Sequence, residues 1–320
     1  MKILHLEYEK YPQESIDILE SKHDIIAFDC NSQEELYSHL ESNFYDVIFT
    51  RLGLNLDKRC IELQLGKIKY IVSPTTGLNH IDVDFATEKS ISVVSLSGEF
   101  EFLNQIRSTA EHTWGLLLML IRHLREATQI TLLNGWSRSN FMSDELSSKT
   151  LGIIGYGRLG QIISRYGVAF NMEVKVFDKD ISKINDLPTG VEFYNLDDIL
   201  KSSDYIILLI NFTKDNIRFI GKNEFMKMKE GAYFINTARG ELIDEDALIS
   251  SLYSGKIKGA ALDVLAGDST WGSTVQGQNH LIDYAKSNNN LLITPHMGGY
   301  GINSITQTRK FIVQKFLNIN

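Results

Sequence analysis

Three polar residues late in the chain have the chemistry needed to reduce a carbonyl group. Arg239, in AYFINTARGEL, can grip a carboxylate through two hydrogen bonds and polarise a neighbouring carbonyl oxygen. His296, in LLITPHMGG, can donate a proton near neutral pH, and Asp268, in ALDVLAGD, can hold its ring and stabilise the charged form. An arginine beside a glycine is by itself more often an ordinary surface residue. These side chains therefore indicate catalysis only if the fold brings them together.

Each of the three follows a short apolar run that is typical of a buried strand. Arg239 comes after AYFIN, Asp268 after KGAALDV and His296 after NLLITP. In an open parallel sheet, ligands bind beside the carboxyl ends of the strands. The topology therefore predicts that these three side chains converge on one crevice.

A glycine-rich turn precedes these strands, in TLGIIGYGRLGQII. Its six residues, Gly155, Tyr156, Gly157, Arg158, Leu159 and Gly160, stand between an apolar run and an amphipathic one. Such a turn suits the binding of a dinucleotide, because the glycines permit a tight turn, a close pyrophosphate and a closely packed helix. The bland alternative is a tight strand-to-helix turn without a ligand.

Asp178 favours the dinucleotide interpretation and indicates which dinucleotide is bound. It ends the next apolar run, EVKVFD, 18 residues after Gly160, close to the spacing of a carboxylate that binds ribose hydroxyls. A carboxylate there repels a 2′-phosphate, so NAD is expected rather than NADP. The neighbouring Lys179 weakens this preference without reversing it.

The rhythm of apolar runs predicts two doubly wound α/β domains. Five strands alternate with helical patterns up to residue 97, and six further strands begin at Thr150. A long helix is expected between them, at about Leu103–Arg125, and a last one at Ile302–Leu317, which could return to the first domain. We expect one domain of residues 1–101 and 297–320, and a dinucleotide-binding domain of residues 102–296.

The composition excludes several classes of partner. The formal net charge is −8, which gives no basis for binding nucleic acid or an anionic membrane. The longest apolar run, Trp114–Ile121, is too short to span a bilayer. Since no apolar run is long enough for a membrane span, we expect a cytoplasmic protein. Cys30 and Cys60 lie in no metal-binding pattern, so we expect two reduced thiols and no metal site.

Several of these stretches resemble one enzyme family, the D-isomer-specific 2-hydroxyacid dehydrogenases. The resemblance extends over most of the chain, and the NTARG and TPH blocks in this order are its most specific part. It implies a Rossmann coenzyme domain inserted in a flavodoxin-like substrate domain. The blocks are SPTTGLNHID (73–82), STAEHTWGLLLML (108–120), LGIIGYGRLG (151–160), GAYFINTARGELIDEDAL (231–248), GAALDVLAGD (259–268) and LLITPHMGG (291–299).

The resemblance also implies a role for individual residues. Arg239 and His296 fall on the catalytic arginine and the acid/base histidine, and Asp268 stands where the family has glutamate. The other implied contacts are Asp263 with the nicotinamide carboxamide, Thr237 and Ala238 with the nicotinamide pocket, and the backbone of Thr76 and Gly77 with the substrate carboxylate. A homodimer through the coenzyme domain is implied as well, with Trp136 and Phe141 as candidate contacts.

Two of the proposed site residues, Asp268 and Asn211, depart from the family pattern. Asp268 is one methylene shorter than glutamate, so its contact with His296 requires a shift of its loop. Asn211 replaces a proline that is common in the nicotinamide-side wall of the cofactor site.

The expected function is hydride transfer between NAD and a D-2-hydroxy acid or its 2-oxo acid. The two departures keep a second possibility open, an NAD-binding sensor or interaction protein like the corepressors related to this family. A relative acting on formate or phosphite is a third. Retention of both Arg239 and His296 favours the enzyme.

Overall fold

The chain forms two compact units. The computed structural model describes residues 1–268, 274–275 and 277–319. The first unit comprises Met1–Ile106, the described part of Gly267–Gln276, and the chain from Gly301 on; the second comprises Arg107–Ala266 and Gly277–Tyr300. The predicted crossings near residues 101 and 297 lie a few residues before these divisions.

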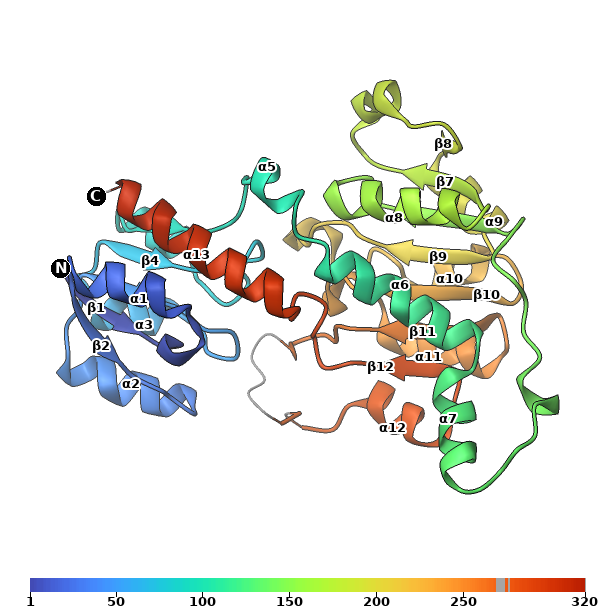
Figure 1. The fold of residues 1–320 in the computed structure, drawn as a ribbon, viewed down its shortest axis with the longest axis horizontal. Coiled ribbons are helices and arrows are strands. Elements are labelled where there is room, and N and C mark those ends of the chain that lie inside the picture. Colours follow the sequence, from blue (N-terminus) through green and yellow to red (C-terminus); the bar gives the residue numbers. More distant parts are fainter. Residues whose placement is uncertain (269–273, 276, 320) are drawn as a thin grey trace. The chain divides into compact units, whose positions relative to one another are not determined.

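The first unit is a five-stranded parallel sheet with helices on both faces (Figure 1). Its strand order, β2-β1-β3-β4-β5, is that of flavodoxin-like folds and confirms the predicted fold class. The strands are β1 (Lys2–His5), β2 (Asp24–Ala27), β3 (Val47–Phe49), β4 (Tyr70–Val72) and β5 (Ser92–Val94). The helical segments are η1 (Tyr8–Lys10), α1 (Gln13–Glu20), α2 (Gln33–Ser42), α3 (Lys58–Leu63), α4 (Val83–Glu88), α5 (Phe100–Leu103) and α13 (Ile302–Ile319).

The last helix, α13, completes the core of this first unit. Its buried residues Ile312, Val313 and Phe316 pack in one apolar cluster with Ile3 and Val47 of the sheet. The expectation that the C-terminal helix returns to the first domain is therefore confirmed. The helix extends two residues beyond the predicted end.

The second unit is a seven-stranded parallel sheet in the order β12-β11-β10-β9-β6-β7-β8. Read from the glycine turn, this is the Rossmann order with one added strand, as expected of a dinucleotide-binding domain. The strands are β6 (Thr150–Ile154), β7 (Glu173–Phe177), β8 (Val191–Phe193), β9 (Tyr205–Leu208), β10 (Ala232–Asn236), β11 (Ile257–Leu262) and β12 (Leu291–Ile293). The sequence predicts only six, because β8 is a three-residue edge strand whose apolar signal is too short.

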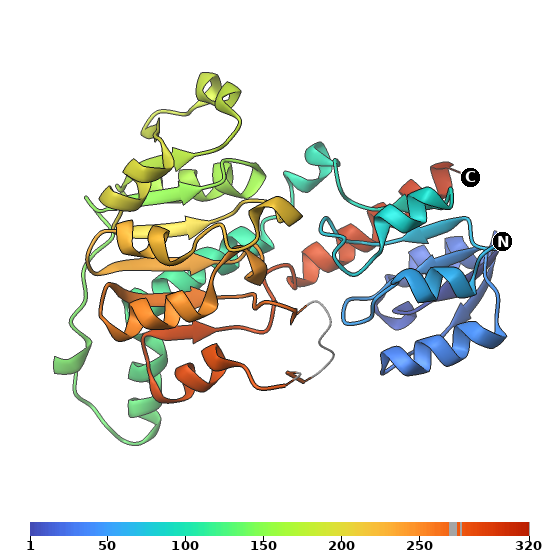
Figure 2. The ribbon, with the colours of Figure 1, turned by 180° about the vertical axis from the view of Figure 1, so that it is seen from behind.

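Helices cover both faces of this second sheet (Figures 1 and 2). The helices α6 and α8 pack on one face, and α9 to α12 form a row on the other. The helices are α6 (Ser108–Ile121), α7 (Leu124–Leu132), α8 (Arg158–Ala169), α9 (Leu196–Ser202), α10 (Lys222–Lys227), α11 (Glu245–Tyr253) and α12 (His280–Ser287). Short 3-10 turns are η2 (Ser139–Phe141), η3 (Ile181–Asp186), η4 (Lys214–Asn216) and η5 (Gly240–Leu242).

The prediction of one helix over Leu103–Arg125 is wrong. Leu103 and Ile106 pack in the core of the first unit, so the chain leaves helical conformation there before α6 begins at Ser108. At the other end His123 adopts a left-handed backbone conformation, with φ of 51°, which separates α6 from α7. Apolar periodicity alone carries no signal for either break.

The described residues include neither a membrane-spanning helix nor a cluster of metal ligands. No helix in the described part of the chain is long and apolar enough to cross a membrane. Among those same residues, no group of three or more His, Cys, Asp or Glu side chains is placed to hold a metal ion. Cys30 and Cys60 are both buried free thiols.

Candidate active site

The glycine turn between β6 and α8 has the geometry of a phosphate-binding loop. Gly155 has φ of +105°, and a side chain there would meet the backbone of Leu209 and Ile210 at 2.7–2.8 Å. A Cβ on Gly160 would lie 2.2 Å from the carbonyl oxygen of Gly155, so the helix packs directly on the turn. A Cβ on Gly157 would meet nothing within 4 Å. The first and third glycines are thus required by the fold, and the second leaves open space beside the helix N-terminus.

That open space suits a pyrophosphate. Gly157 is the N-cap of the twelve-residue helix α8 and provides no capping side chain, so the positive end of the helix dipole is not covered by a side chain of the cap residue. The side chains of Tyr156 and Leu159 pack against the core cluster of this unit. Tyr156 is buried and Leu159 is partly buried, so the turn presents mainly its backbone, and it fits NAD in this respect.

Asp178, the residue after β7, links the glycine turn to the sheet through a hydrogen bond. Its Oδ2 accepts a hydrogen bond of 2.8 Å from the backbone N–H of Tyr156, and its Oδ1 accepts one of 3.0 Å from that of Asp180. Lys183 donates to the same Oδ2 at 2.6 Å. The carboxylate stands where ribose hydroxyls are expected. Lys183 is a neighbour that sequence reasoning missed, because no periodicity pairs a residue of η3 with a strand end.

The turn that carries Arg239 is shaped by Asn236, the last residue of β10. The buried amide of Asn236 accepts a hydrogen bond of 3.0 Å from the N–H of Ala238 and donates one of 2.8 Å to the carbonyl of Arg239. Arg239 is partly buried, and its Nη1 donates to the carbonyl oxygen of Ala238 at 2.6 Å. Thr237, almost fully buried, shares a 2.8 Å hydrogen bond with Thr113 of α6.

Gly240, the residue after Arg239, fixes a second loop of the site. A Cβ on Gly240 would lie only 2.0 and 2.1 Å from backbone atoms of Leu265 and Ala266. The N–H of Ala266 also donates a 2.8 Å hydrogen bond to Glu245 of α11. The close approach of Gly240 and the hydrogen bond to Glu245 thus hold the chain at Ala266, two residues before Asp268. Asp268 itself is partly buried and belongs to the first unit.

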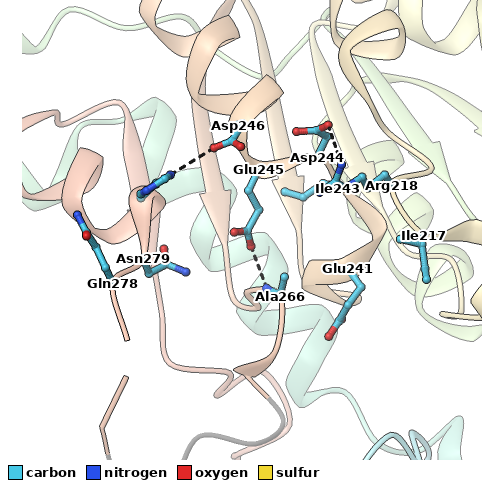
Figure 3. Close-up of a pocket in the computed structure, with 11 residues that line it drawn as sticks. Ile217, Arg218, Glu241, Ile243, Asp244, Glu245, Asp246, Ala266, Gln278 and Asn279 are labelled. Atoms are coloured by element: carbon cyan, nitrogen blue, oxygen red, sulfur yellow. Dashed lines mark hydrogen bonds and ion pairs between the residues drawn. The ribbon is translucent and has the colours of Figure 1, made fainter. Parts of the chain in front are cut away.

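An open pocket of about 400 Å³ lies beside this loop (Figure 3). Glu245 points across it toward Ala266, and Arg218 lies beside Asp244, 3.8 Å away. Its lining residues are Ile217, Arg218, Glu241, Ile243, Asp244, Glu245, Asp246, Ala266, Gln278, Asn279 and His280. None of the predicted site residues lines this pocket, so it is not the site of the predicted chemistry.

His296 lies on the loop after β12 with φ of 50°, a left-handed conformation that costs a non-glycine residue about 1 kcal/mol. Its N–H donates to the carbonyl of Thr294 at 2.9 Å. Asp263, at the end of β11, accepts hydrogen bonds from the next two amides, of Met297 at 2.9 Å and Gly298 at 2.7 Å. The loop conformation is therefore held by a carboxylate on the neighbouring strand.

Asp263 is buried and remains a good acceptor. Burial alone would raise the pKa of its carboxyl group, but the hydrogen bonds from His112, Thr294 and the two loop amides outweigh burial and hold the pKa below its usual value. The partner His112, on α6, is half-buried and 3.1 Å from Oδ1. Its position on an apolar helix favours a place in the core or at a domain interface over a substrate contact, so this hydrogen bond to Asp263 could not be read from sequence.

Arg239, Asp263 and His296 follow three neighbouring parallel strands, β10, β11 and β12. Adjacent strands lie roughly 4.8 Å apart, so all three turns emerge at one edge of the sheet. The turns of Arg239 and His296 therefore lie at the carboxyl end of this sheet, where the topology predicts that Arg239, Asp268 and His296 converge.

The remaining predicted residues lie on exposed loops. Asn211, after β9, is exposed and accepts a hydrogen bond from Asn216 through its backbone carbonyl. In the first unit Thr76 and Gly77 follow β4, and Thr75 Oγ1 donates to the carbonyl of Gly77 at 2.8 Å. Buried His80 contacts Ser73 at 3.1 Å in the same turn, so it orders this loop, as its position at a turn suggests.

The chain is similar to a known family of dehydrogenases. A family model described as the NAD-binding domain of D-isomer specific 2-hydroxyacid dehydrogenases matches residues 114–298, which is more than half of the chain. The second unit is thus an NAD-binding Rossmann domain of an oxidoreductase family. The whole chain belongs to the D-isomer specific 2-hydroxyacid dehydrogenases, as its sequence motifs suggest.

Individual relatives agree with this assignment. A D-3-phosphoglycerate dehydrogenase of Archaeoglobus fulgidus is 36% identical over 73% of this chain, which spans only 43% of the relative's length. A protein of Staphylococcus aureus named as a 2-hydroxyacid dehydrogenase is 33% identical over 78% of this chain and 75% of its own. The crystal structure of a D-lactate dehydrogenase from Aquifex aeolicus, with NAD and lactic acid, aligns with a TM-score of 0.81 and 27% identity, covering 100% of this chain and 95% of that one.

Proposed function

We propose that the chain interconverts a D-2-hydroxy acid and its 2-oxo acid with NAD as coenzyme. The observation that carries the proposal is the placement of Arg239 and His296 on turns that flank Asp263 at one edge of the NAD-binding sheet. A site with a fixed cation and a proton donor is what a 2-oxo acid requires, because the carboxylate must be held while its neighbouring carbonyl is protonated.

The proposed roles follow from the chemistry of each side chain. Arg239 holds the substrate carboxylate and polarises the carbonyl oxygen. His296 protonates that oxygen during reduction and takes the proton back during oxidation, and Asp268 stabilises the charged ring. When bound, NADH supplies the hydride. The backbone of Thr76 and Gly77 provides further donors for the carboxylate.

Residues of the second unit would hold the coenzyme. The turn 155–160 receives the pyrophosphate and Asp178 receives the adenosine ribose, in line with the open space at Gly157 and the strand-end position of the carboxylate. The nicotinamide half is assigned to Asn211, Thr237, Ala238 and Asp263. Of these four, Asp263 accepts hydrogen bonds from two amides of the His296 loop. A contact with the nicotinamide would be a further hydrogen bond of the same carboxylate.

We also propose a homodimer formed through the second unit. The helix α7 has no buried residues, and the segment after it exposes 81% of Leu133, 92% of Trp136 and 91% of Met142. Phe141 in this segment is half-buried. Apolar side chains gathered this way on one segment are typical of a surface that is covered in an assembly.

The experiment that tests the activity is NADH oxidation with a panel of 2-oxo acids, including glyoxylate, pyruvate, hydroxypyruvate and phenylpyruvate. We expect turnover of at least one acid, a fall in kcat of at least about 100-fold in His296→Asn, and a higher KM in Arg239→Lys. NADH affinity, measured by fluorescence titration, should stay within about threefold of wild type in both variants. Tight NADH binding without turnover of any acid would instead favour the sensor.

A further inference from the structure

We propose that His112 is a positioning residue for His296, acting through Asp263 and Thr294 on the loop after β12. The proposal rests on the proposed function, because it concerns the histidine that would exchange the proton. His112 itself lies on α6, and its ring nitrogen contacts the carboxylate of Asp263 at 3.1 Å and the hydroxyl of Thr294 at 3.0 Å. These contacts connect a helix to both strands that border the loop.

The hydrogen-bond pattern fixes which way each proton points. The hydroxyl of Thr294 has a single proton, and its shortest contact, 2.6 Å, is to Oδ1 of Asp263, which as a carboxylate can only accept. The hydroxyl therefore cannot also donate to the imidazole of His112. The Nε2 of His112 must carry the hydrogen and donate it to Asp263 and Thr294. The imidazole of His112 is thus the donor, and the side chains of Asp263 and Thr294 are the acceptors.

The same carboxylate also accepts hydrogen bonds from the backbone next to His296. Asp263 is 2% exposed, and its two oxygens receive the amides of Met297 and Gly298, the two residues directly after His296. A single carboxylate therefore links His112 to the amides that follow the proposed acid/base residue. The depressed pKa of Asp263 agrees with this arrangement, since the acceptor is ionised.

The first turn of α6 contacts the loop after β12 at a second point. Ser108 Oγ donates to the carbonyl oxygen of Gly298 at 2.7 Å. A Cβ at Gly298 would lie 2.9 Å from Asp263 Oδ2 and 3.3 Å from Thr109 Cγ2, so the loop backbone is pressed against the helix and the carboxylate. Because the left-handed conformation of His296 is held by these neighbours, loosening them should misplace its ring.

Removal of the donor tests the proposal. His112→Leu keeps a similar volume but leaves Asp263 without this donor, whereas His112→Gln can place an amide N–H near the position of Nε2. For the 2-oxo acid reduced fastest in the panel, we expect His112→Leu to lower kcat at least tenfold with NADH affinity within threefold of wild type. His112→Gln should return kcat to within about threefold of wild type.

A spectroscopic readout separates positioning from folding and from the proposed activity. The ring signal of His296 is identified in a histidine-labelled NMR spectrum as the one missing in His296→Gln. We expect it to shift or broaden in His112→Leu and to return in His112→Gln, while the melting temperature identifies any variant that does not fold. Thr294→Val, which removes the bridging hydroxyl with little change of shape, should move the same signal.

Failure of this proposal and failure of the proposed function give different results. An unchanged His296 signal in both His112→Leu and Thr294→Val would overturn the positioning role, whatever the wild type catalyses. An altered signal with wild-type kcat in His112→Leu would also overturn it. If the wild type turns over no 2-oxo acid, the proposed function fails, and the NMR comparison still decides whether His112 orders the loop.

Discussion

Two small buried side chains, Asn236 and Asp263, shape the turns that carry the proposed catalytic residues. Asn236 closes the turn of Arg239, and Asp263 receives two amides of the loop of His296. Each satisfies backbone donors or acceptors that would otherwise be left without a partner beside the sheet. The sequence motifs draw attention to Arg239 and His296, but the residues that hold them are visible only in the structure.

At the residue scale, Gly160 and Gly157 of the phosphate turn should respond differently to one methyl group. Gly160→Ala places Cβ 2.2 Å from a backbone oxygen, so the turn or the helix must move, and we expect a loss of roughly 1–3 kcal/mol in the free energy of unfolding. Gly157→Ala meets no atom, so its stability should fall by no more than about 1 kcal/mol, the cost of an alanine N-cap.

The two variants should separate most clearly in coenzyme binding. Because the space at Gly157 is where the pyrophosphate would approach, Gly157→Ala should weaken NADH binding about tenfold or more while remaining folded. Urea denaturation and fluorescence titration with NADH measure the two effects. NADH binding equal to wild type in a folded Gly157→Ala protein would contradict the role given to this glycine.

At the element scale, the two parallel sheets were predictable and the element boundaries were not. Regular alternation of apolar and amphipathic runs predicts both parallel sheets, because parallel strands are buried on both faces and give strong signals. The edge strand β8 has three residues and gives almost none. The break between α5 and α6 is set by tertiary packing of Leu103 and Ile106, which no local pattern records.

The contact of η5 with the segment after β11 gives an element-scale prediction. Gly240→Ala would place Cβ at 2.0–2.5 Å from backbone atoms of Leu265 and Ala266, so one of the two loops must be displaced. We expect a loss of about 1–3 kcal/mol in stability together with a large fall in kcat, since both Arg239 and the chain leading to Asp268 are disturbed. Thermal melting and NADH oxidation measure these effects.

Gly299→Ala is the matched control for that variant. A Cβ on Gly299 meets nothing within 4 Å, although this glycine also lies close to a proposed catalytic residue. Its melting temperature should stay within a few degrees of wild type. A Gly240→Ala protein as stable and as active as Gly299→Ala would show that the close approach of the two loops is unimportant.

At the scale of the whole molecule, each unit has its own sheet and core, and the second carries the match to the family's NAD-binding domain. The motif blocks made both folds and the coenzyme predictable. They could not predict where the carboxylate of Asp268 lies, because that depends on the loop geometry around Ala266. Nor could they show that His112 and Asp263, far apart in sequence, form one hydrogen-bonded group.

The stability of the molecule should depend on pH through a buried histidine of the first unit. His5, at the end of β1, is fully buried, and burial, followed by the charge of Arg309, lowers its pKa to about 3. In the unfolded chain a histidine has a pKa near 6.5. Between these values the unfolded state binds the extra proton, so stability must fall as pH falls from about 6.5 toward 3.

A substitution isolates this contribution from the carboxylates. Below pH 6, wild type should lose on the order of 1 kcal/mol more per pH unit than His5→Phe, as measured by urea denaturation over a pH series. If the curves of wild type and His5→Phe are parallel, the buried neutral state of His5 is excluded.

The proposed assembly has its own test at this scale. Trp136→Arg places a charge on the exposed apolar segment after α7 and should shift a dimer toward monomer in light scattering. Met226→Ser removes a side chain that is 58% exposed on α10 and should leave the mass unchanged. The same mass for Trp136→Arg and wild type would contradict a dimer through this segment.

The transfer of the hydride itself can be followed with a labelled coenzyme. The protein is incubated with pyruvate and the larger 2-oxo acids, together with NADH deuterated at both C4 positions, and the products are separated on a chiral column and weighed by mass spectrometry. We expect one deuterium at C2 of the D-2-hydroxy acid, formed at least about 100-fold more slowly by His296→Asn. Label in the L-enantiomer, or NADH binding without label in any acid, would contradict it.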